Sequence, residues 1–530
     1  MHYSRRSFLA QAAGLATALT LQKMASAQAA TGGVLNIGSQ SMRTLNPAIQ
    51  PGNATGVPGT QLFAGLVQLD RAFAPVPYLA KSWEVSKDGL EYRFNLVDNA
   101  VFHDGKPIKA SDVVFSLETV KASHPLMSVT YGAILESVKA LDDHTISIRV
   151  KKPFVGLFGL LTPALTPIMP EHVFGKNAGA IQTNPANNAP IGSGPYKFVE
   201  WRQGEHLILE RHAEFFRSGQ PHFDRLVFKL IEDSLTKALS MEKGDIDYLP
   251  FSFLRVNDLK RLSENEALVV TSKGYEALGP VNYLELNLRE APFNDIRVRQ
   301  AIAHAIDKDF ISKTLHKGMS RPLDGPLHSG SAYFARDALT RYPFDLNKAN
   351  QLLDEAGLVR KSGDIRIQLT LDVPTFEPDS MQLVADYLKS QLRRVGIDVQ
   401  IRKSTDLADW SSKVGQWNYQ MTMNSTWNWS DPVVGVNRSF LSSNIKKQTW
   451  TNTEGYSNPK VDELLTKAAT ENDPARRKEM YAEFQKIVSE DLAFIWTNEG
   501  IYTTVYNKKL ANVSLSVFGA LAPFDEIRLA

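Results

Sequence analysis

Tryptophan is concentrated in one stretch of this chain. Five of its eight tryptophans lie between residues 401 and 450, namely Trp410, Trp417, Trp427, Trp429 and Trp450. Tryptophan faces can stack on a sugar ring or a guanidinium, or enclose an alkylammonium by cation-π attraction of about 0.5 to 2 kcal/mol per contact. Large aromatic side chains are also commonly buried in cores. The stretch therefore indicates a stacking surface for a small ligand, with core packing as the alternative for each ring.

Motifs for covalent or metal-assisted catalysis do not occur in the sequence. It contains no His-Glu-x-x-His, no Gly-x-Ser-x-Gly, no Walker lysine and no cysteine. Thiolate nucleophiles, thiolate-bound zinc and iron-sulfur clusters are thereby excluded. His206 and His212 would share one strand face, and exposed strand positions are favoured over a metal site there. We predict that the chain is not an enzyme and uses no cofactor or metal.

The first 27 residues indicate export. Twin arginines at positions 5 and 6 precede a weakly apolar stretch from Phe8 to Leu21, the pattern of a twin-arginine signal. That stretch is too short to span a bilayer as a mature helix, and Ala25-Ser26-Ala27 follows it as a cleavage signature. We predict cleavage near Ala27. Because no cysteine can carry a lipid anchor, a free periplasmic protein is the predicted product.

Charge and size limit what the mature protein could be. The formal net charge is +2, and removal of the three basic residues in the signal leaves −1. This balance argues against a nucleic-acid partner or an anionic lipid surface. Beyond the signal no apolar run reaches about 18 residues, so we expect no membrane span. About 500 mature residues exceed one usual core, so two or three lobes are expected in a monomer.

The first part of the mature chain alternates like strands. Residues 34–38 predict a first strand, and residues 83–96 predict a hairpin around Lys87-Asp88-Gly89. Ser111 is the predicted N-cap of a helix through Leu117, and residues 146–150 alternate again. Residues 71 to about 191 are therefore interpreted as a small mixed lobe rich in hairpins.

The second half predicts helices that alternate with strands. Asp295, Asp345 and Asp473 each stand where an N-cap is needed, ahead of residues spaced for one buried helix face. A further helix containing Val384 and Val395 precedes a strand at 397–401, and another begins after Asn458-Pro459. Helix followed by strand favours a layered α/β lobe.

Several sequence blocks resemble the family 5 extracellular solute-binding proteins, the group that delivers peptides, nickel and other solutes to ABC importers. The resemblance covers essentially the whole mature chain. The matching blocks are Leu79–Glu84, Phe102–Pro107, Ala110–Leu117, Gly192–Phe198, Phe293–Ile302, Ala305–Asp307, Gln351–Gly357 and Tyr456–Asp462. Eight blocks in family order make the resemblance specific. Most of them are fold signatures, and Gly192, Gly194 and Pro195 suit a tight chain reversal between lobes.

The resemblance implies an α/β, periplasmic binding protein-like fold (type II, cluster C). Two main lobes would surround a hinge, with an extra small α+β lobe. Lobe I would comprise residues 28–70, 192–282 and 499–530, lobe II residues 71–191, and lobe III residues 283–498. Crossing strands around Tyr283–Asn287 and Ile495–Thr503 would form the hinge. The ligand would bind between lobes I and III, which close over it.

The resemblance also directs attention to the block Asn424–Pro432. Its spacing is similar to the segment where peptide-binding relatives place an aspartate that pairs with the ligand's ammonium. Asn428 holds that position here, and a neutral amide cannot supply the charge. The loop of residues 373–378 also has no arginine where dipeptide binders carry a carboxylate clamp. We therefore expect a ligand other than an ordinary free dipeptide.

The predicted ligand-binding residues are Trp427, Asn428, Trp429, Asp431, Tyr419 and Trp450. The two tryptophans beside Asn428 are expected to line the cleft. Asp431 could replace the missing charge, although an aspartate before proline is more often a turn former. Tyr419 and Trp450 are further candidates. For Trp410 and Trp417, core or surface packing is expected.

Together these observations predict a periplasmic solute-binding protein of an ABC importer. It would capture a peptide-like or other small organic solute and deliver it to the inner-membrane permease, which ATPase subunits drive. A periplasmic chaperone or ligand sensor on the same fold is the alternative, and one saturable small-molecule site would distinguish the transport protein. The ligand itself is left open among a peptide, an amine or opine, a sugar conjugate and a metal chelate.

Overall fold

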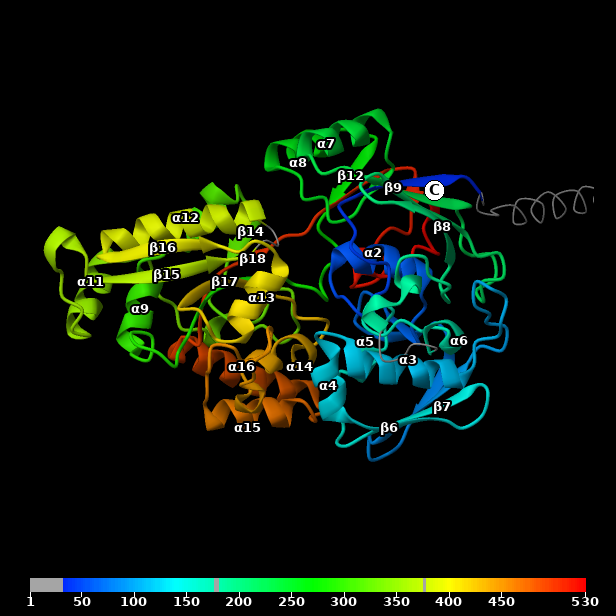
Figure 1. The fold of residues 1–530 in the computed structure, drawn as a ribbon, viewed down its shortest axis with the longest axis horizontal. Helices are drawn as coiled ribbons and strands as arrows, with labels where there is room; N and C mark the ends of the chain where they lie inside the picture. Colours follow the sequence, from blue (N-terminus) through cyan, green and yellow to red (C-terminus); the bar gives the residue numbers. More distant parts are fainter. Residues whose placement is uncertain (1–31, 176–180, 375–377) are drawn as a thin grey trace, which may run out of the picture.

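The computed structural model describes residues 32–175, 181–374 and 378–530 (Figure 1). The predicted signal, residues 1–27, and residues 375–377 of the arginine-free loop lie outside the described residues. Three separate sheets of seven, six and four strands organise the chain into three lobes. Within the described ranges, no helix combines the length and apolar character needed to cross a bilayer.

Lobe I is built on the seven-stranded mixed sheet, whose strands come from three distant parts of the chain. They are β1 (Val34–Ser39), β8 (Tyr196–Arg202), β9 (His206–Arg211), β10 (Arg225–Leu230), β11 (Tyr248–Leu249), β12 (Leu268–Thr271) and β19 (Thr504–Asn507). The sheet order is β12-β19-β11-β1-β10-β9-β8. β1 pairs in parallel with β10, Val34 opposite Arg225. The remaining elements are α2 (Asn53–Leu62), β2 (Val67–Leu69), α7 (Ser234–Lys243), α8 (Val256–Ser263), β20 (Leu510–Ala511), a 3-10 turn η8 (Gly519–Leu521) and β21 (Arg528–Leu529).

Lobe II is small and antiparallel. Its sheet has the order β4-β5-β7-β6, and the predicted hairpin of residues 83–96 forms its first pair. Its elements are β3 (Pro75–Pro77), β4 (Ala80–Val85), β5 (Glu91–Leu96), α3 (Ala110–Ser123), α4 (Met127–Ile134), β6 (Leu135–Ala140), β7 (Thr145–Val150), α5 (Leu157–Leu160), α6 (Glu171–Phe174) and η2 (Pro185–Asn187). The first helix begins one residue before Ser111, and its N-cap is Lys109. Ser111 was therefore a wrong N-cap prediction; Asp112 instead accepts a hydrogen bond from the Lys109 backbone N–H.

Lobe III contains the six-stranded mixed sheet with the order β14-β18-β13-β17-β15-β16. Its strands are β13 (Val281–Leu286), β14 (Ser320–Pro322), β15 (Ile367–Val373), β16 (Ile397–Lys403), β17 (Met421–Thr426) and β18 (Phe494–Gly500). Its helices are α9 (Ile296–His304), α10 (Lys308–Phe310), α11 (Leu346–Glu355), α12 (Pro378–Arg394), α13 (Leu407–Gly415), α14 (Pro432–Gly435), α15 (Pro459–Ala468) and α16 (Pro474–Asp491). Short turns complete it: η3 (Ile311–Leu315), η4 (Arg336–Ala338), η5 (Ser362–Asp364), η6 (Asn437–Ser439) and η7 (Ser442–Asn444).

Sequence-derived helix caps in lobe III agree with the structure. Asp295, Asp345 and Asp473 each accept backbone N–H groups in the first turn of α9, α11 and α16, as predicted. Gly357 and Gly396 follow the ends of α11 and α12 with φ of 79° and 85°, the left-handed region that favours glycine. These local signals fixed where the helices of lobe III begin and end.

The hydrophobic cores divide the molecule differently from the sheets. One continuous cluster of buried side chains runs through lobes I and II, from Leu35 in β1 to Leu117 in α3, and it includes Trp429 and Val434 of lobe III. Lobe III has cores of its own on the two faces of its sheet, one under α9, α11 and α12 and one under α15 and α16. Lobes I and II therefore share one core, and lobe III packs mainly on cores of its own but joins the first core at Trp429 and Val434 (Figure 1).

Two short connections join lobe III to lobe I. The chain leaves the seven-stranded sheet after β12 and enters the six-stranded sheet at β13, so residues 272–280 form the first crossing. It returns between β18 and β19 through residues 501–503. The lobe III sheet thus extends from residue 281 to residue 500.

Close backbone packing explains the glycines of the block Gly192–Phe198. A Cβ on Gly192 would lie 1.9 Å from the Leu62 carbonyl oxygen, and one on Gly194 would lie 2.4 Å from that of Gln61. The chain therefore returns to lobe I pressed against the end of α2, which only glycine permits. His212 follows β9 and is buried, 3.3 Å from the Gly194 carbonyl oxygen through its Nδ1. The expectation of an exposed strand position for His212 was wrong.

Candidate ligand-binding site

Aromatic side chains from both sides of the lobe crossing meet in one group. We call this group the hinge aromatic cluster; its members are Phe251, Phe253, Tyr275, Trp427, Trp429, Tyr502 and Phe518. Lobe I supplies the phenylalanines, the crossings supply the tyrosines, and lobe III supplies the tryptophans. The group is therefore assembled only when the two lobes come together.

Trp427 is the lobe III member with contacts to both other sources. Its ring lies nearly parallel to that of Phe251, at 11° and 6.5 Å between centroids. Its indole Nε1 donates a hydrogen bond of 3.0 Å to the Tyr502 hydroxyl. Trp427 and Tyr502 are half-buried, and Phe253 is 42% exposed. Part of the cluster is thus accessible to solvent.

The loop that carries Phe251 and Phe253 is held in an unusual backbone conformation. Both residues have positive φ, 44° and 45°, a region that bulky residues adopt only when the surroundings impose it. The Tyr275 hydroxyl accepts the Phe251 N–H at 2.9 Å, and the Thr503 carbonyl accepts the Ser252 N–H at 2.8 Å. The loop is therefore fixed to both crossings. Burial raises the pKa of Tyr275 to about 12, so its hydroxyl is neutral at physiological pH.

The loop of residues 427–430 is fastened to the first crossing. The Asn428 N–H donates to the Leu278 carbonyl at 2.7 Å, and the Ser430 N–H donates to the Ala277 carbonyl at 2.7 Å. Trp429 is 3% exposed and packs 6.5 Å from Phe518 of lobe I. Asn428 is 4% exposed, and its Oδ1 accepts the His328 backbone N–H at 2.9 Å.

Asp431 lies at the end of this loop and has partners for both carboxylate oxygens. Arg477 donates to them at 2.6 Å in a bidentate pair, and Asp431 also accepts the Val433 N–H as the N-cap of α14. The Arg477 side chain is only 4% exposed. These contacts give Asp431 a role in fixing the loop, because a carboxylate held this way has little capacity left for a ligand.

Tyr419 and Trp450 belong to a different group inside lobe III. Together with Trp410 and Val414 they form what we call the inner aromatic cluster. The Tyr419 hydroxyl donates to Glu285 Oε1 at 2.6 Å, and the Trp450 ring lies 6.0 Å from Trp410. Trp410 is fully buried, as expected from its predicted core role, and its Nε1 donates to the Thr422 hydroxyl at 2.9 Å. This group packs α13 against the sheet.

A buried carboxylate on strand β18 of lobe III contacts the segment that holds Asn428. Glu499 in β18 is 1% exposed and accepts the Ser329 N–H at 2.6 Å, with Arg321 at 3.1 Å. His328 lies 3.8 Å away, and burial lowers the pKa of its imidazole. His328 is therefore neutral at physiological pH, and the charge of Glu499 is met by Arg321.

Sequence reasoning missed the lobe I and crossing members of the cluster. Phe251 and Phe253 follow the short strand β11 in the run Leu249-Pro250-Phe251-Ser252-Phe253. Two phenylalanines after a proline were the available signal, but nothing local says which distant ring they meet. Tyr502 did lie in the predicted crossing segment. No group of three or more histidine or acidic side chains in the described parts of the chain is arranged to hold a metal ion.

The chain belongs to the bacterial extracellular solute-binding proteins of family 5. The family model matches residues 74–448, which is more than half of the chain. This agrees with the resemblance found in the eight sequence blocks. The protein is therefore a solute-binding protein of the kind that serves ABC importers.

Curated relatives and solved structures support the same class. The glutathione-binding protein GsiB of Pectobacterium atrosepticum is 26% identical over 513 residues, covering 94% of each chain. The probable D,D-dipeptide-binding periplasmic protein DdpA of Escherichia coli is 29% identical, covering 82% of this chain and 80% of its own. The periplasmic binding protein DppA of Helicobacter pylori, in complex with the peptide STSA, matches with a TM-score of 0.81 at 23% identity. That structure covers 95% of this chain and 99% of its own, and it shows the shared fold.

Proposed function

We propose that this protein captures a small peptide-like solute between lobes I and III, at the hinge aromatic cluster. The observation that carries the proposal is the origin of the rings, because lobe I, lobe III and the two crossings each contribute. A molecule bound there would touch both lobes at once. Among the predicted contacts, Trp427, Asn428 and Trp429 belong to this site; Tyr419, Trp450 and Asp431 are engaged elsewhere.

The chemistry of the cluster favours a ligand with an apolar or planar part. All seven members of the cluster are Phe, Tyr or Trp, and burial keeps the Tyr275 hydroxyl neutral. Rings of this kind recognise apolar groups and the faces of amides by stacking. The names of GsiB and DdpA, a glutathione binder and a probable D,D-dipeptide binder, favour a peptide-like compound that differs from an ordinary L-dipeptide.

Closure of the lobes would sequester the solute. Lobes I and II share a core, whereas lobe III has its own cores and is joined by residues 272–280 and 501–503. Rotation about these crossings would separate Phe251 and Phe253 from Trp427. A ligand that contacts both sides favours the closed form because it binds that form better.

In the cell we place this protein in the periplasm as a monomer without enzymatic activity. The twin-arginine pattern and the cleavage signature at Ala27 support export. The closed form would then present the solute to an inner-membrane permease with ATPase subunits. Membership in an extracellular solute-binding family supports this route. A periplasmic chaperone or a sensor would share the fold but would show no delivery of one small molecule.

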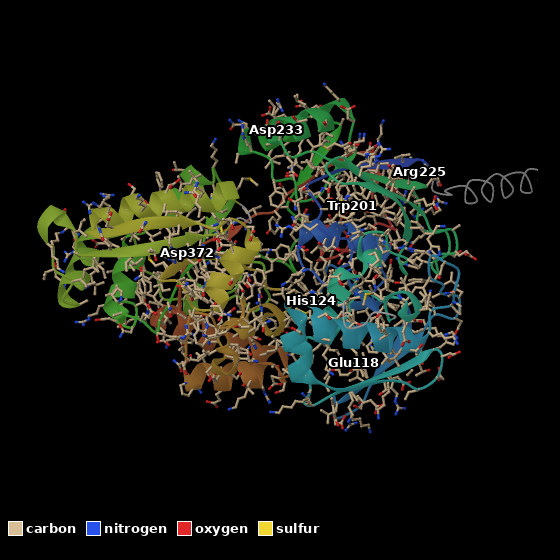
Figure 2. All side chains as sticks on the ribbon, viewed as in Figure 1. Glu118, His124, Trp201, Arg225, Asp233 and Asp372 are labelled. Carbon is tan, nitrogen blue, oxygen red and sulfur yellow. The ribbon has the colours of Figure 1, made fainter. Side chains whose placement is uncertain are left out.

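The test combines ligand identification with one substitution. Native mass spectrometry of protein purified from periplasm would detect a co-purifying solute, and calorimetry would measure its affinity. Trp427→Ala should weaken binding about tenfold or more, because it removes the ring between the two lobes. Trp201→Ala is the matched control, since Trp201 is also half-buried but lies on β8 of lobe I (Figure 2). Equal affinity in both variants would refute the site, and turnover of the solute would refute the binding-protein assignment.

A further inference from the structure

Asn428 has an orientation that its neighbours determine completely. Its backbone N–H is bound by Leu278, and its Oδ1 lies 2.9 Å from the backbone nitrogen of His328. A backbone N–H can only donate, so the side-chain atom that faces it must be the amide oxygen. The usual ambiguity between the two ends of an asparagine amide is therefore removed.

The other end of the amide is an unused donor. Asn428 Nδ2 is buried, and no acceptor within hydrogen-bonding distance occurs for it in the described portion of the chain. Two N–H groups thus point into a protein interior where nearly all donors have partners. The whole side chain is only 4% exposed. An acceptor supplied from outside the chain would complete this position.

The loop around Asn428 cannot easily turn the amide away. Trp429 and Ser430 follow it with positive φ of 50° and 68°, and Ser430 is bound to Ala277 of the first crossing. A Cβ on Gly435 would lie 2.4 Å from the Asn428 carbonyl carbon, so α14 presses against the loop from the other side. The backbone is thereby held between the crossing and α14.

The partner of the amide oxygen is held equally firmly. His328 is followed by Ser329, whose N–H and hydroxyl both donate to Glu499 of β18, at 2.6 and 2.5 Å. β18 leads directly into the second crossing. Asn428 is therefore held by the first crossing through Leu278 and, through His328 and Ser329, by the strand that leads into the second crossing.

We propose that Asn428 Nδ2 donates a hydrogen bond to an acceptor oxygen of the ligand, a carbonyl or a carboxylate. This inference rests on the proposed function, because it assigns the ligand group that meets lobe III at that site. A free ammonium would bring donor against donor there. The structure thus assigns the specificity to peptide-like solutes whose amino-terminal end lies at lobe III and is acylated or, as in a γ-glutamyl group, carries a carboxylate.

The experiment compares matched probes on the mature full-length chain by calorimetry. The probes are L-Ala-L-Ala and D-Ala-D-Ala, each with a free and with an N-acetylated amino terminus, and glutathione. At least one probe with an acceptor oxygen at its amino-terminal end, an N-acetylated peptide or glutathione, should bind. An N-acetylated peptide should bind at least tenfold more tightly than its free-amine partner. The proposal would be overturned if no probe with an amino-terminal acceptor binds, or if both members of a pair bind with equal affinity.

Substitutions separate this inference from the proposed function. Asn428→Asp keeps an oxygen for the His328 N–H but turns the free donor into an acceptor, so it should reverse the preference toward the free amine. Asn418→Asp adds the same charge at an exposed position of lobe III and should leave the preference unchanged. If Asn428→Asp does not fold, Asn428→Ala should reduce the tenfold preference to near unity. An unchanged preference in the Asn428 variants, with binding still lost in Trp427→Ala, would reject the inference alone. Binding that Trp427→Ala leaves intact would reject the proposed site.

Discussion

The tryptophan-rich stretch of the chain supplies two aromatic clusters with opposite characters. The inner aromatic cluster is complete within lobe III, and its polar atoms are paired: Trp410 with Thr422, and Tyr419 with Glu285. The hinge aromatic cluster draws on three separated segments, includes the exposed ring of Phe253, and adjoins the unused amide donor of Asn428. A cluster whose polar atoms are paired stabilises its own lobe. A cluster between lobes that adjoins an unpaired donor can still bind a ligand. The same residue type thus serves two purposes fewer than 20 residues apart.

The largest effect is expected for the inner aromatic cluster. Trp410→Ala removes a fully buried ring and its hydrogen bond to Thr422, so it should lower the free energy of unfolding by about 3 to 5 kcal/mol. Denaturant unfolding measures this loss. Ligand affinity of the folded fraction should not change, because the ring lies outside the hinge aromatic cluster. A stable Trp410→Ala variant with impaired binding would reverse the assignment of the two clusters.

The next effect concerns the ion pair that fixes the loop of the hinge aromatic cluster. Asp431→Asn removes one partner of the bidentate pair and leaves the buried Arg477 charge uncompensated, at a cost of about 3 kcal/mol in the free energy of unfolding. Asp406→Asn is the control, since Asp406 is an exposed N-cap of α13 that forms no ion pair with any described residue, and it should cost less than about 1 kcal/mol. Equal losses would mean that the pair contributes only helix capping.

A pH-dependent effect distinguishes the interior of lobe III from the hinge. Burial raises the pKa of Glu454, which has no hydrogen-bond partner for either carboxylate oxygen in the described chain, and nearby Glu285 raises it further. A raised folded-state pKa means that the native protein holds more protons than the unfolded chain above the ordinary pKa of about 4.3. Stability should therefore fall as the pH rises through that window.

Glu454→Gln removes this titration. The variant should gain about 1 to 2 kcal/mol of unfolding free energy over the parent at pH 8, and the gain should shrink toward pH 4. Thermal unfolding across this range measures the difference. A parent protein whose stability relative to the variant does not change with pH would contradict the assignment of a neutral buried acid.

The smallest stability effect is expected at the exposed edge of the hinge aromatic cluster. Phe253→Ala should change the free energy of unfolding by less than about 1 kcal/mol, because 42% of the residue is already exposed. It should nevertheless weaken ligand binding severalfold, which calorimetry would detect. Val199→Ala, at a similarly exposed position on β8, should change neither quantity. If Phe253→Ala leaves the ligand affinity unchanged, this ring of lobe I does not contact the ligand and the proposed site between the lobes is contradicted.

Local signals in the sequence predicted much of lobe III and lobe II. Asp295, Asp345 and Asp473 correctly predicted where three helices begin, because N-capping depends only on the next few residues. The same reasoning failed at Ser111, because Lys109 is the N-cap and the Asp112 side chain accepts its backbone N–H. The capping propensity of one residue does not determine where a helix begins when another side chain nearby can pair with the backbone N–H groups at its start.

The members of the hinge aromatic cluster could be predicted from the sequence only in part. The block around Asn428 pointed to Trp427 and Trp429, which do lie at the crossing, but Phe251 and Phe253 belong to a loop about 175 residues earlier. Contacts over such distances depend on how two sheets are placed, and no local pattern encodes that. Tyr419 and Trp450 were near in sequence to the predicted segment, yet strand β17 carries the chain from the inner cluster to the hinge.

The central claim is that ligand binding at the hinge aromatic cluster brings lobe III toward lobe I. The chain has no cysteine, so Lys243→Cys on α7 of lobe I and Lys389→Cys on α12 of lobe III give two exposed spin-label positions. Pulsed electron-electron double resonance measures the distance between them. The distance between the labels should shorten and its distribution should narrow when a probe that binds by calorimetry saturates the protein, and Trp427→Ala should abolish the change. A saturating probe that leaves the interlabel distance unaltered would contradict the account.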